Sequence, residues 1–189
     1  MSVLVYTETE NGKLKKTALE VASYAKGVAD MLGTSVTAVT VNATDTAELG
    51  KYGVEKVLTV TNDKLNNFNA KAYADVLKQA AAKENSKVIV ISSSANAKFL
   101  APILAINLNA GYASNVVALP ESESPFKVKR TAFTNKAFNI TEISTDVKLV
   151  GLSKNAFGLK ESDAAATTED FTPELNEGDF STEVTSVDK

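Results

Sequence analysis

The stretch that most limits the fold runs from Lys87 to Gly111, KVIVISSSANAKFLAPILAINLNAG. It begins with an unbroken apolar run at 88–91, which is typical of a strand buried on both faces of a parallel sheet. Three serines follow, and from about Asn96 the apolar residues recur at helical spacing. Gly111 is well placed to end that helix. The stretch therefore predicts a strand, a polar turn and a helix.

The polar turn has two interpretations. At the carboxyl end of a parallel strand, free N–H groups at the start of the next helix can bind a ligand. An adenine nucleotide would then be bound where the first and fourth predicted strands end, by Thr7, Glu8, Ser92, Ser93, Ser94 and Asn96. Serine and asparagine before a helix more often cap their own backbone. The turn also lacks the glycine spacing of dinucleotide sites and P-loops, so capping is the simpler interpretation.

Strand-like and helix-like apolar patterns alternate as far as residue 119. Strands are predicted at 3–6, 36–41, 57–60, 88–91 and 116–119, and helices at 14–32, 44–49, 72–81 and 96–108. The expected caps are Gly33 after the first helix, Thr44 or Asp45 before the second and Asn69 before the third. Five strands alternating with helices over short connections predict an α/β fold, a doubly wound, Rossmann-like and mostly parallel sheet.

The pattern changes after Pro120. Segments 126–133, 137–145 and 147–153 are rich in strand formers with no helix between them, so these strands are expected to be antiparallel or to cross between sheets. We expect 126–153 to add a small antiparallel layer. The α/β domain would span 1–158. Residues 159–178 are acidic and weakly apolar, which is typical of a solvated excursion. Apolar side chains then alternate loosely, as in an edge strand or an arm, at Phe180, Val184 and Val187. We expect 159–189 to lead toward a further domain.

Composition removes several classes of function. The 189 residues include no cysteine and no histidine, so the chain has no thiolate or imidazole metal ligand and no Ser-His-Asp or Cys-His catalysis of its own. A formal charge of -3 gives no basic footprint for nucleic acid or an anionic membrane. The N-terminus has no basic leader, and no apolar stretch approaches the roughly 20 residues of a membrane span. We expect a cytoplasmic protein without a metal site or membrane insertion.

The charged side chains do not predict an active site. Two pairs of carboxylates fall in predicted turns, Glu8 with Glu10 and Glu121 with Glu123. Carboxylates in turns are mostly solvated, so neither pair predicts acid–base catalysis. Lys127, Lys129 and Arg130 form a basic stripe along a predicted strand, which a solvated strand face explains at least as well.

Four segments together resemble a known family. They are SVLVYTETENGKLKKTALEVASYAKGVADMLG, YGVEKVLTV with NAKAYADVLKQAA, FLAPILAINLNAGYASNVVAL, and VKRTAFTNKAF. The last has a basic residue and a threonine before an aromatic residue, two small residues and an alanine, at Arg130, Thr131, Phe133, Asn135 and Ala137. In this order, the segments resemble the N-terminal domain of electron transfer flavoprotein alpha subunits.

The resemblance implies an electron carrier subunit rather than an enzyme. In this family the alpha subunit pairs with a similar beta subunit, and FAD passes electrons from the acyl-CoA dehydrogenases of fatty acid beta-oxidation to a quinone reductase and the respiratory chain. It also implies an adenine nucleotide alpha hydrolase-like fold, with FAD bound by a domain outside this chain. The chain itself would be a scaffold without flavin or catalytic residues.

Two expectations about binding concern the partners that the resemblance implies. Exposed strand edges are templates for pairing, so the segments at 126–153, with Arg130, Phe133 and Asn135, and the arm from Phe180 to Val187 would form much of the contact with the beta subunit and the flavin domain. The alternative is that the charges of Lys127, Lys129 and Glu142 protect these edges. AMP is held by the beta subunit in this family, so the matching cleft of this chain would be a relic. The alternative is that the chain is an adenine-nucleotide-binding, Rossmann-like module.

Overall fold

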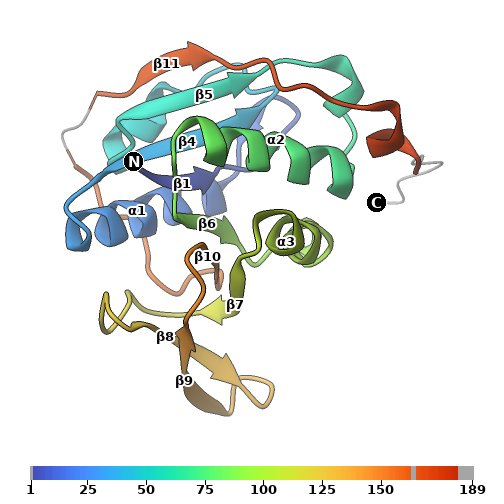
Figure 1. Ribbon diagram of the computed structural model, residues 1–189. Helices are drawn as coiled ribbons and strands as arrows, with labels where there is room; N and C mark the ends of the chain where they lie inside the picture. The colour runs from blue at the N-terminus through green and yellow to red at the C-terminus, as the bar shows by residue number, and fades with distance from the viewer. Residues whose placement is uncertain (1, 163–164, 183–189) are drawn as a thin grey trace.

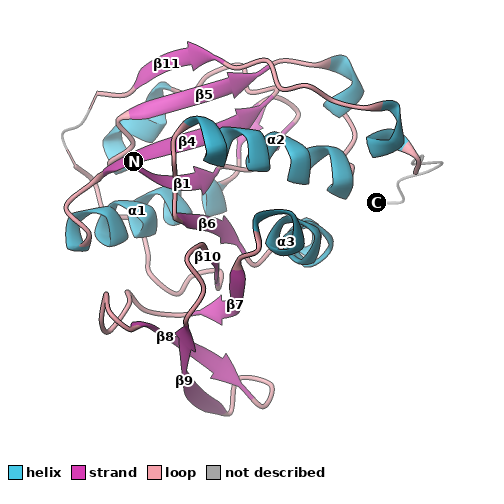
Figure 2. Ribbon diagram, viewed as in Figure 1, coloured by secondary structure: helices cyan, strands magenta, loops and turns pink. Residues whose placement is uncertain are grey.

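Strands and helices alternate along most of the chain (Figures 1 and 2). The computed structural model describes residues 2–162 and 165–182. Its strands are β1 (Ser2–Tyr6), β2 (Thr9–Glu10), β3 (Lys13–Leu14), β4 (Ser35–Val41), β5 (Lys56–Val60), β6 (Val88–Ser92), β7 (Gly111–Val116), β8 (Phe126–Ala132), β9 (Ala137–Ile143), β10 (Lys148–Leu152) and β11 (Thr167–Asp170). Its helices are α1 (Lys16–Met31), α2 (Ala70–Lys83) and α3 (Ala95–Leu108), with 3₁₀ helices η1 (Ala47–Tyr52), η2 (Asp63–Leu65) and η3 (Glu177–Phe180).

Within the described residues, nine strands form one sheet in the order β11-β5-β4-β1-β6-β10-β7-β8-β9. The pairs from β11 to β7 are parallel, whereas β7 with β8 and β8 with β9 are antiparallel. Helix α1 packs on one face of the sheet, and α2 and α3 pack on the other. A separate antiparallel pair joins β2 and β3. The predicted class, a doubly wound and mostly parallel α/β sheet, is confirmed.

Two apolar cores hold the layers together, one on each face of the sheet. Along β1, Val3 and Val5 belong to the core that contains α1, whereas Leu4 and Tyr6 belong to the core that contains α2 and α3. The residues of β6 divide in the same alternating way. All residues of β1 and β6 are buried, because these strands lie in the middle of the sheet with helices on both sides. Their unbroken apolar runs correctly predicted this position.

Two predicted helix caps are confirmed. The backbone at Gly33 has φ +61°, a left-handed conformation that glycine adopts without steric cost, and Thr34 N–H then bonds to the Ala29 carbonyl at 2.9 Å. The Asn69 side chain accepts hydrogen bonds from the N–H groups of Lys71 and Ala72. Helices α1 and α2 therefore end and begin where the sequence indicated.

The second helix differs from the prediction. It is the 3₁₀ helix η1, and it begins at Ala47 after Thr46 instead of at Thr44 or Asp45. The Asp45 carboxylate accepts a hydrogen bond from Ala47 N–H, whereas the Thr44 hydroxyl donates to the Gly12 carbonyl. Both polar side chains form hydrogen bonds in the turn before the helix. The helix therefore begins three residues later than predicted.

Gly111 does not end α3, and the fifth strand is not at 116–119. Asn109 takes the left-handed conformation at the end of the helix, with φ +49°, and Gly111 begins β7. A Cβ at Gly111 would lie 2.6 Å from Cγ2 of Ile143 and 2.7 Å from Oγ1 of Thr145. The glycine is therefore needed for the close approach of another segment. The small and polar residues of β7 do not form the apolar run that marks the central strands.

Strand β10 was predicted to be antiparallel, and this was wrong. It lies between β6 and β7 and runs parallel to both. The β8–β9 hairpin brings the chain back to the edge where β7 begins, since Ile143 lies beside Gly111 and the Gly111 N–H bonds to the Val147 carbonyl. The chain then enters the sheet after residues 144–147 only. The hairpin takes the place of the crossover helix that a parallel strand usually needs.

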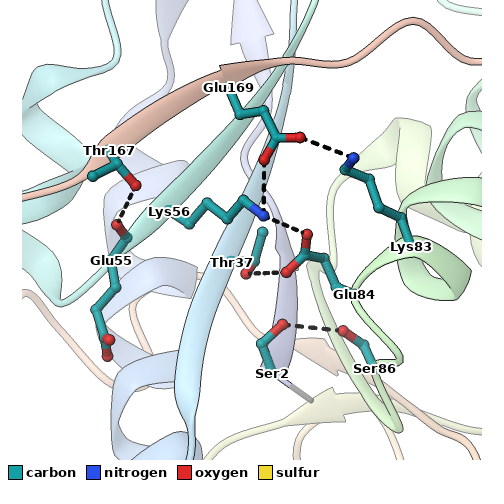
Figure 3. A network of polar contacts seen from close by, with 9 residues as sticks. All are labelled: Ser2, Thr37, Glu55, Lys56, Lys83, Glu84, Ser86, Thr167 and Glu169. Atoms are coloured by element: carbon teal, nitrogen blue, oxygen red, sulfur yellow. Dashed lines mark hydrogen bonds and ion pairs between the residues drawn. The ribbon is translucent and has the colours of Figure 1, made fainter.

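The acidic segment 159–178 was predicted to be a solvated excursion, and part of it is ordered as β11. Figure 3 shows the ion network that helps to hold this strand beside β5. Lys56 Nζ lies 2.8 Å from carboxylate oxygens of both Glu84 and Glu169, and Lys83 Nζ lies 2.8 Å from Glu169. Hydrogen bonds from Lys56 and Lys83 lower the pKa of Glu169 to about 2. Charge and backbone pairing hold β11, so apolar periodicity could not predict it.

The arm that was expected from Phe180 to Val187 is only partly described. Phe180 lies in η3 and packs against the core that contains α2, so it is not extended. The Glu174 backbone exchanges two hydrogen bonds with the Gln79 side chain of α2. Val184 and Val187 lie outside the described residues.

Glu20 anchors the segment that follows β10 onto α1. Its carboxylate is buried and accepts hydrogen bonds from the N–H groups of Asn155, Phe157 and Gly158 at 2.9 to 3.0 Å. Burial of the carboxylate raises its pKa, but these hydrogen bonds outweigh burial, so the pKa of Glu20 is lowered. The chain after β10 therefore leaves the sheet along a path set by one side chain of α1.

We expect Glu20→Gln to lower the free energy of unfolding at pH 7 by about 2 kcal/mol, because the amide replaces a charged acceptor of three N–H groups. Since the folded pKa is depressed, the contribution of Glu20 is complete above about pH 4.3 and is lost as pH falls through the lowered value. Urea unfolding between pH 3 and 7 should show a smaller acid-induced loss in the variant. The exposed Glu48→Gln is the control, and equal stability of the two variants at pH 7 would contradict the anchor.

Candidate functional site

The chain reverses direction across the sheet between β1 and β6. From β1 it continues to β4 and β5 on one side, and then returns to β6 on the other side of β1. In open α/β sheets, ligands bind at the carboxyl ends of the strands beside such a reversal. A cleft of about 720 Å³ opens here, lined by the turn after β1, the end of β4, the start of α2 and Asn96.

Glu8 is the most buried charged group of this cleft, with 3% of its surface exposed. The Ser92 hydroxyl donates a hydrogen bond to Oε1 of Glu8, which joins the ends of β1 and β6. Its other oxygen, Oε2, lies 3.5 Å from Nζ of Lys15 and has no hydrogen-bond partner among the described residues. One acceptor of a buried carboxylate is therefore left for the cleft.

The six residues predicted for a nucleotide do not all face the cleft. The Thr7 hydroxyl donates to the Val39 carbonyl at 3.0 Å, so it is used inside the sheet. Ser93 N–H bonds to the Leu152 carbonyl, and Ser94 Oγ accepts the N–H of Ala97 as the N-cap of α3. The residues of the predicted set that line the cleft are Glu8 and Asn96.

Three aromatic rings on the cleft wall were not predicted. The rings of Tyr6 and Tyr73 meet edge to face at 6.1 Å, and Phe68 lies 5.1 Å from Tyr73. Burial, followed by the Glu8 charge, raises the pKa of Tyr73 to about 12, so its phenol remains protonated at neutral pH and donates to the Leu65 carbonyl. Lys15 was also missed. Tyr6 and Tyr73 lie inside predicted elements and Phe68 lies just before one, where an aromatic side chain usually indicates only core.

The cleft does not suit a phosphate or the diphosphate of a flavin nucleotide. Its charged lining residues are Glu8, Glu10 and Lys15, so two carboxylates face one ammonium. The first turn of α3 is capped by Ser94, which occupies an N–H that a phosphate would need. We therefore assign no flavin-binding role to these residues. No group of three or more potential metal ligands occurs in the part of the chain that the structure describes.

The predicted interface residues meet at the β8–β9 hairpin, which projects from one end of the sheet (Figure 1). Arg130, Phe133 and Asn135 line one hollow of about 510 Å³. The Arg130 guanidinium donates to Ser114 Oγ at 3.1 Å, which ties β8 to β7. Phe133 is 83% exposed at the turn.

The other side of the hairpin faces a second hollow of about 490 Å³. Lys129, Phe138 and Lys154 line it, and the Lys129 ammonium lies 4.5 Å from the centre of the Phe138 ring. Phe138 and Ile140 on β9 are 63% and 45% exposed. Both faces of the hairpin therefore combine exposed apolar side chains with positive charge.

Comparison with known proteins places this geometry in a family. A model of the electron transfer flavoprotein domain matches residues 3–175. The chain belongs to the electron transfer flavoprotein domain family. The matched range contains the cleft, the hairpin and β11, and the resemblance read from the sequence is confirmed.

Curated relatives of this electron transfer flavoprotein domain are named as subunits. The electron transfer flavoprotein subunit alpha of Bacillus subtilis is 26% identical over 151 residues, covering 76% of this chain and 44% of the relative. The corresponding subunit of Thermoanaerobacterium thermosaccharolyticum is 26% identical over 196 residues, covering 99% and 59%. The LctC subunit of the lactate dehydrogenase (NAD(+),ferredoxin) of Acetobacterium woodii is 29% identical over 135 residues, covering 69% and 32%. The chain thus spans 32% to 59% of the length of these relatives.

Family membership indicates a role in electron transfer, and the relatives are electron transfer subunits by name. The alpha-subunit character expected from the sequence agrees with them. None of the described helices is long and apolar enough to cross a bilayer.

Capping by Ser94 gives a direct test of the turn after β6. We expect Ser94→Ala to lower the free energy of unfolding by about 1 kcal/mol, and Ser94→Asp to retain most of it, because aspartate also caps a helix. Thermal and urea unfolding would measure both. A Ser94→Ala variant as stable as the unmodified chain would show that the serine is not needed as a cap.

Proposed function

We propose that this chain is a scaffold domain of an electron transfer flavoprotein and that the β8–β9 hairpin is its docking surface for a beta-type partner subunit. The proposal includes the finer role of the whole protein, which is to carry electrons from acyl-CoA dehydrogenases to the respiratory chain. FAD supplies the one- and two-electron chemistry when bound. The residues described here supply a rigid base and a contact surface. The observation that carries the proposal is the exposure of both faces of the hairpin.

Strand β9 has the surface of a strand that lacks a partner. Residues 137–140 are exposed, although they include Phe138 and Ile140, and β9 lies at the edge of the sheet. An exposed edge with apolar side chains is a template for another chain, and proteins usually cover such an edge or protect it with charge. Lys127 and Glu142 provide one cross-strand ion pair, at 3.9 Å. This single weak pair leaves most of the edge available for docking.

The turn of the hairpin supports the same function. Phe133, Thr134 and Asn135 all have positive φ, between +49° and +64°. A bulky residue such as phenylalanine rarely adopts this conformation, and such strain is concentrated at functional sites. Here it holds the Phe133 ring out in solvent. Large aromatic residues and arginine are the side chains that most often dominate the energy of protein interfaces.

The charge of the hairpin defines its partner. Lys129, Arg130, Lys136 and Lys154 surround the two hollows or the turn, while the whole chain has a net charge of -3. A partner with an acidic rim and an apolar centre would complement this surface. We expect the beta subunit to present such a surface to the hairpin.

Co-expression with the cognate beta subunit tests the docking surface. We expect Phe133→Ser and Arg130→Glu each to weaken the complex by roughly tenfold or more, as for residues at the centre of an interface. Size-exclusion chromatography and calorimetry would measure the effect. Phe133 is exposed, so its substitution should leave folding intact.

Matched controls are Leu159→Ser, which removes an apolar side chain that is 54% exposed, and Lys98→Glu, which reverses an exposed charge on α3. Both controls should bind as the unmodified chain does. If all four variants bind equally, the hairpin is not the docking surface. If the unmodified chain does not bind the beta subunit, it is not a sufficient scaffold.

A further inference from the structure

One polar atom of the cleft beside β1 is buried and accepts no hydrogen bond from the described residues. It is Oε2 of Glu8, whose residue is only 3% exposed. Glu8 lines the cleft of about 720 Å³. A buried polar group without a partner reduces stability, so most such groups are satisfied in native proteins. The cleft therefore offers one unused acceptor to a ligand that donates hydrogen bonds.

The lining indicates the charge of that ligand. Glu8 and Glu10 outnumber Lys15, and the chain's single arginine, Arg130, does not line the cleft. The rings of Tyr6, Phe68 and Tyr73 line the cleft, and aromatic faces attract cations. Five asparagine side chains complete the polar lining. A buried carboxylate beside aromatic rings and amides is suited to an organic cation and unsuited to an anion.

Within the chain, the Glu8 carboxylate is paired with the positive charge of Lys15. Its ammonium lies 3.5 Å from Oε2 of Glu8, which is longer than the roughly 2.7 to 2.9 Å of a charge-assisted hydrogen bond. The Lys15 side chain is 32% exposed, so it can move into solvent without disturbing the core. Lys15 therefore pairs only loosely with Glu8, and the ammonium group of a ligand could take its place.

We propose that this cleft binds a small organic cation, a protonated amine or a guanidinium compound, whose charge is held by Glu8 and whose body packs against the three aromatic rings. The volume lies within the range of about 300 to 1,000 Å³ that is usual for small-molecule sites. This site is separate from the hairpin and does not depend on the docking function. It differs from a nucleotide site in the sign of the charge that it selects.

Matched small molecules test the charge preference with the 189-residue chain. Tyramine and agmatine are the cationic probes, 4-ethylphenol is the neutral counterpart of tyramine, and AMP and inorganic phosphate are the anions. We expect at least one cation to raise the melting temperature in a saturable manner, since it binds the folded state. The neutral and anionic probes should have no such effect. If neither cation stabilises the chain, or if AMP or phosphate does so, the proposal is overturned.

Two substitutions locate the site. Glu8→Gln should weaken binding of the stabilising cation by about tenfold or more, because the amide removes the carboxylate charge that pairs with the cation. Lys15→Gln should strengthen it by roughly threefold to fivefold, because a competing exposed charge is removed. Glu48→Gln is the exposed control and should leave the affinity unchanged. Calorimetry would measure each dissociation constant.

The sign of the Lys15→Gln effect decides between a cation site and an anion site. A site for phosphate would lose affinity when its one lysine is removed, whereas a cation site gains it. This variant keeps the test valid even if Glu8→Gln fails to fold, since Lys15 is partly exposed. Weaker cation binding in Lys15→Gln would overturn the proposal.

Discussion

Strands β1 and β6 lie side by side in the middle of the sheet and are buried on both faces. Strands buried on both faces can carry polar groups only at their ends. The polar groups of this region therefore lie at the carboxyl edge of the sheet. There Glu8 and Ser92 join the two strands through a hydrogen bond. The cleft, the start of α3 and the turn after β1 all take their positions from this pair. Because charge is costly to bury, a carboxylate at this point is strongly constrained by its surroundings.

The β8–β9 hairpin, in contrast, is not covered by helices. It extends beyond the helices, so its apolar residues Phe133, Phe138 and Ile140 have no core to join and remain exposed. Arg130 ties its strand β8 to β7, and at its base the chain returns into β10. The protein thus combines a well-packed centre with one exposed and positively charged edge. A domain of an electron transfer flavoprotein that serves as a base for other parts would have this division.

Local signals predicted the elements that depend on local contacts. The apolar runs of β1 and β6 and the caps Gly33 and Asn69 were found because burial on both faces, left-handed glycine and side-chain capping leave direct traces in sequence. Strands β10 and β11 were misread because their positions depend on distant partners. The hairpin returns the chain for β10, and an ion network centred on Lys56 holds β11.

The candidate sites also contain features that local sequence signals indicate and features that depend on distant segments. Serines and threonines after the strands drew attention to the edge of the sheet where the cleft opens, but the side chains of Thr7 and Ser94 are bonded within the fold, and Ser93 does not line the cleft. The aromatic wall of the cleft comes from segments that meet only in three dimensions, so no spacing rule could have found Phe68 and Tyr73. Family resemblance, by contrast, drew Arg130, Phe133 and Asn135 from one continuous segment, and these three surround one hollow.

Hydrogen–deuterium exchange of the chain with and without the cognate beta subunit tests whether the β8–β9 hairpin is the docking surface. Binding should slow exchange mainly in residues 126–143, with little change in the turns after β1 and β6. Slow exchange of the buried strands should be the same in both states and serves as the internal reference. Protection that falls on the cleft or on α2, and leaves 126–143 unchanged, would contradict docking through the hairpin.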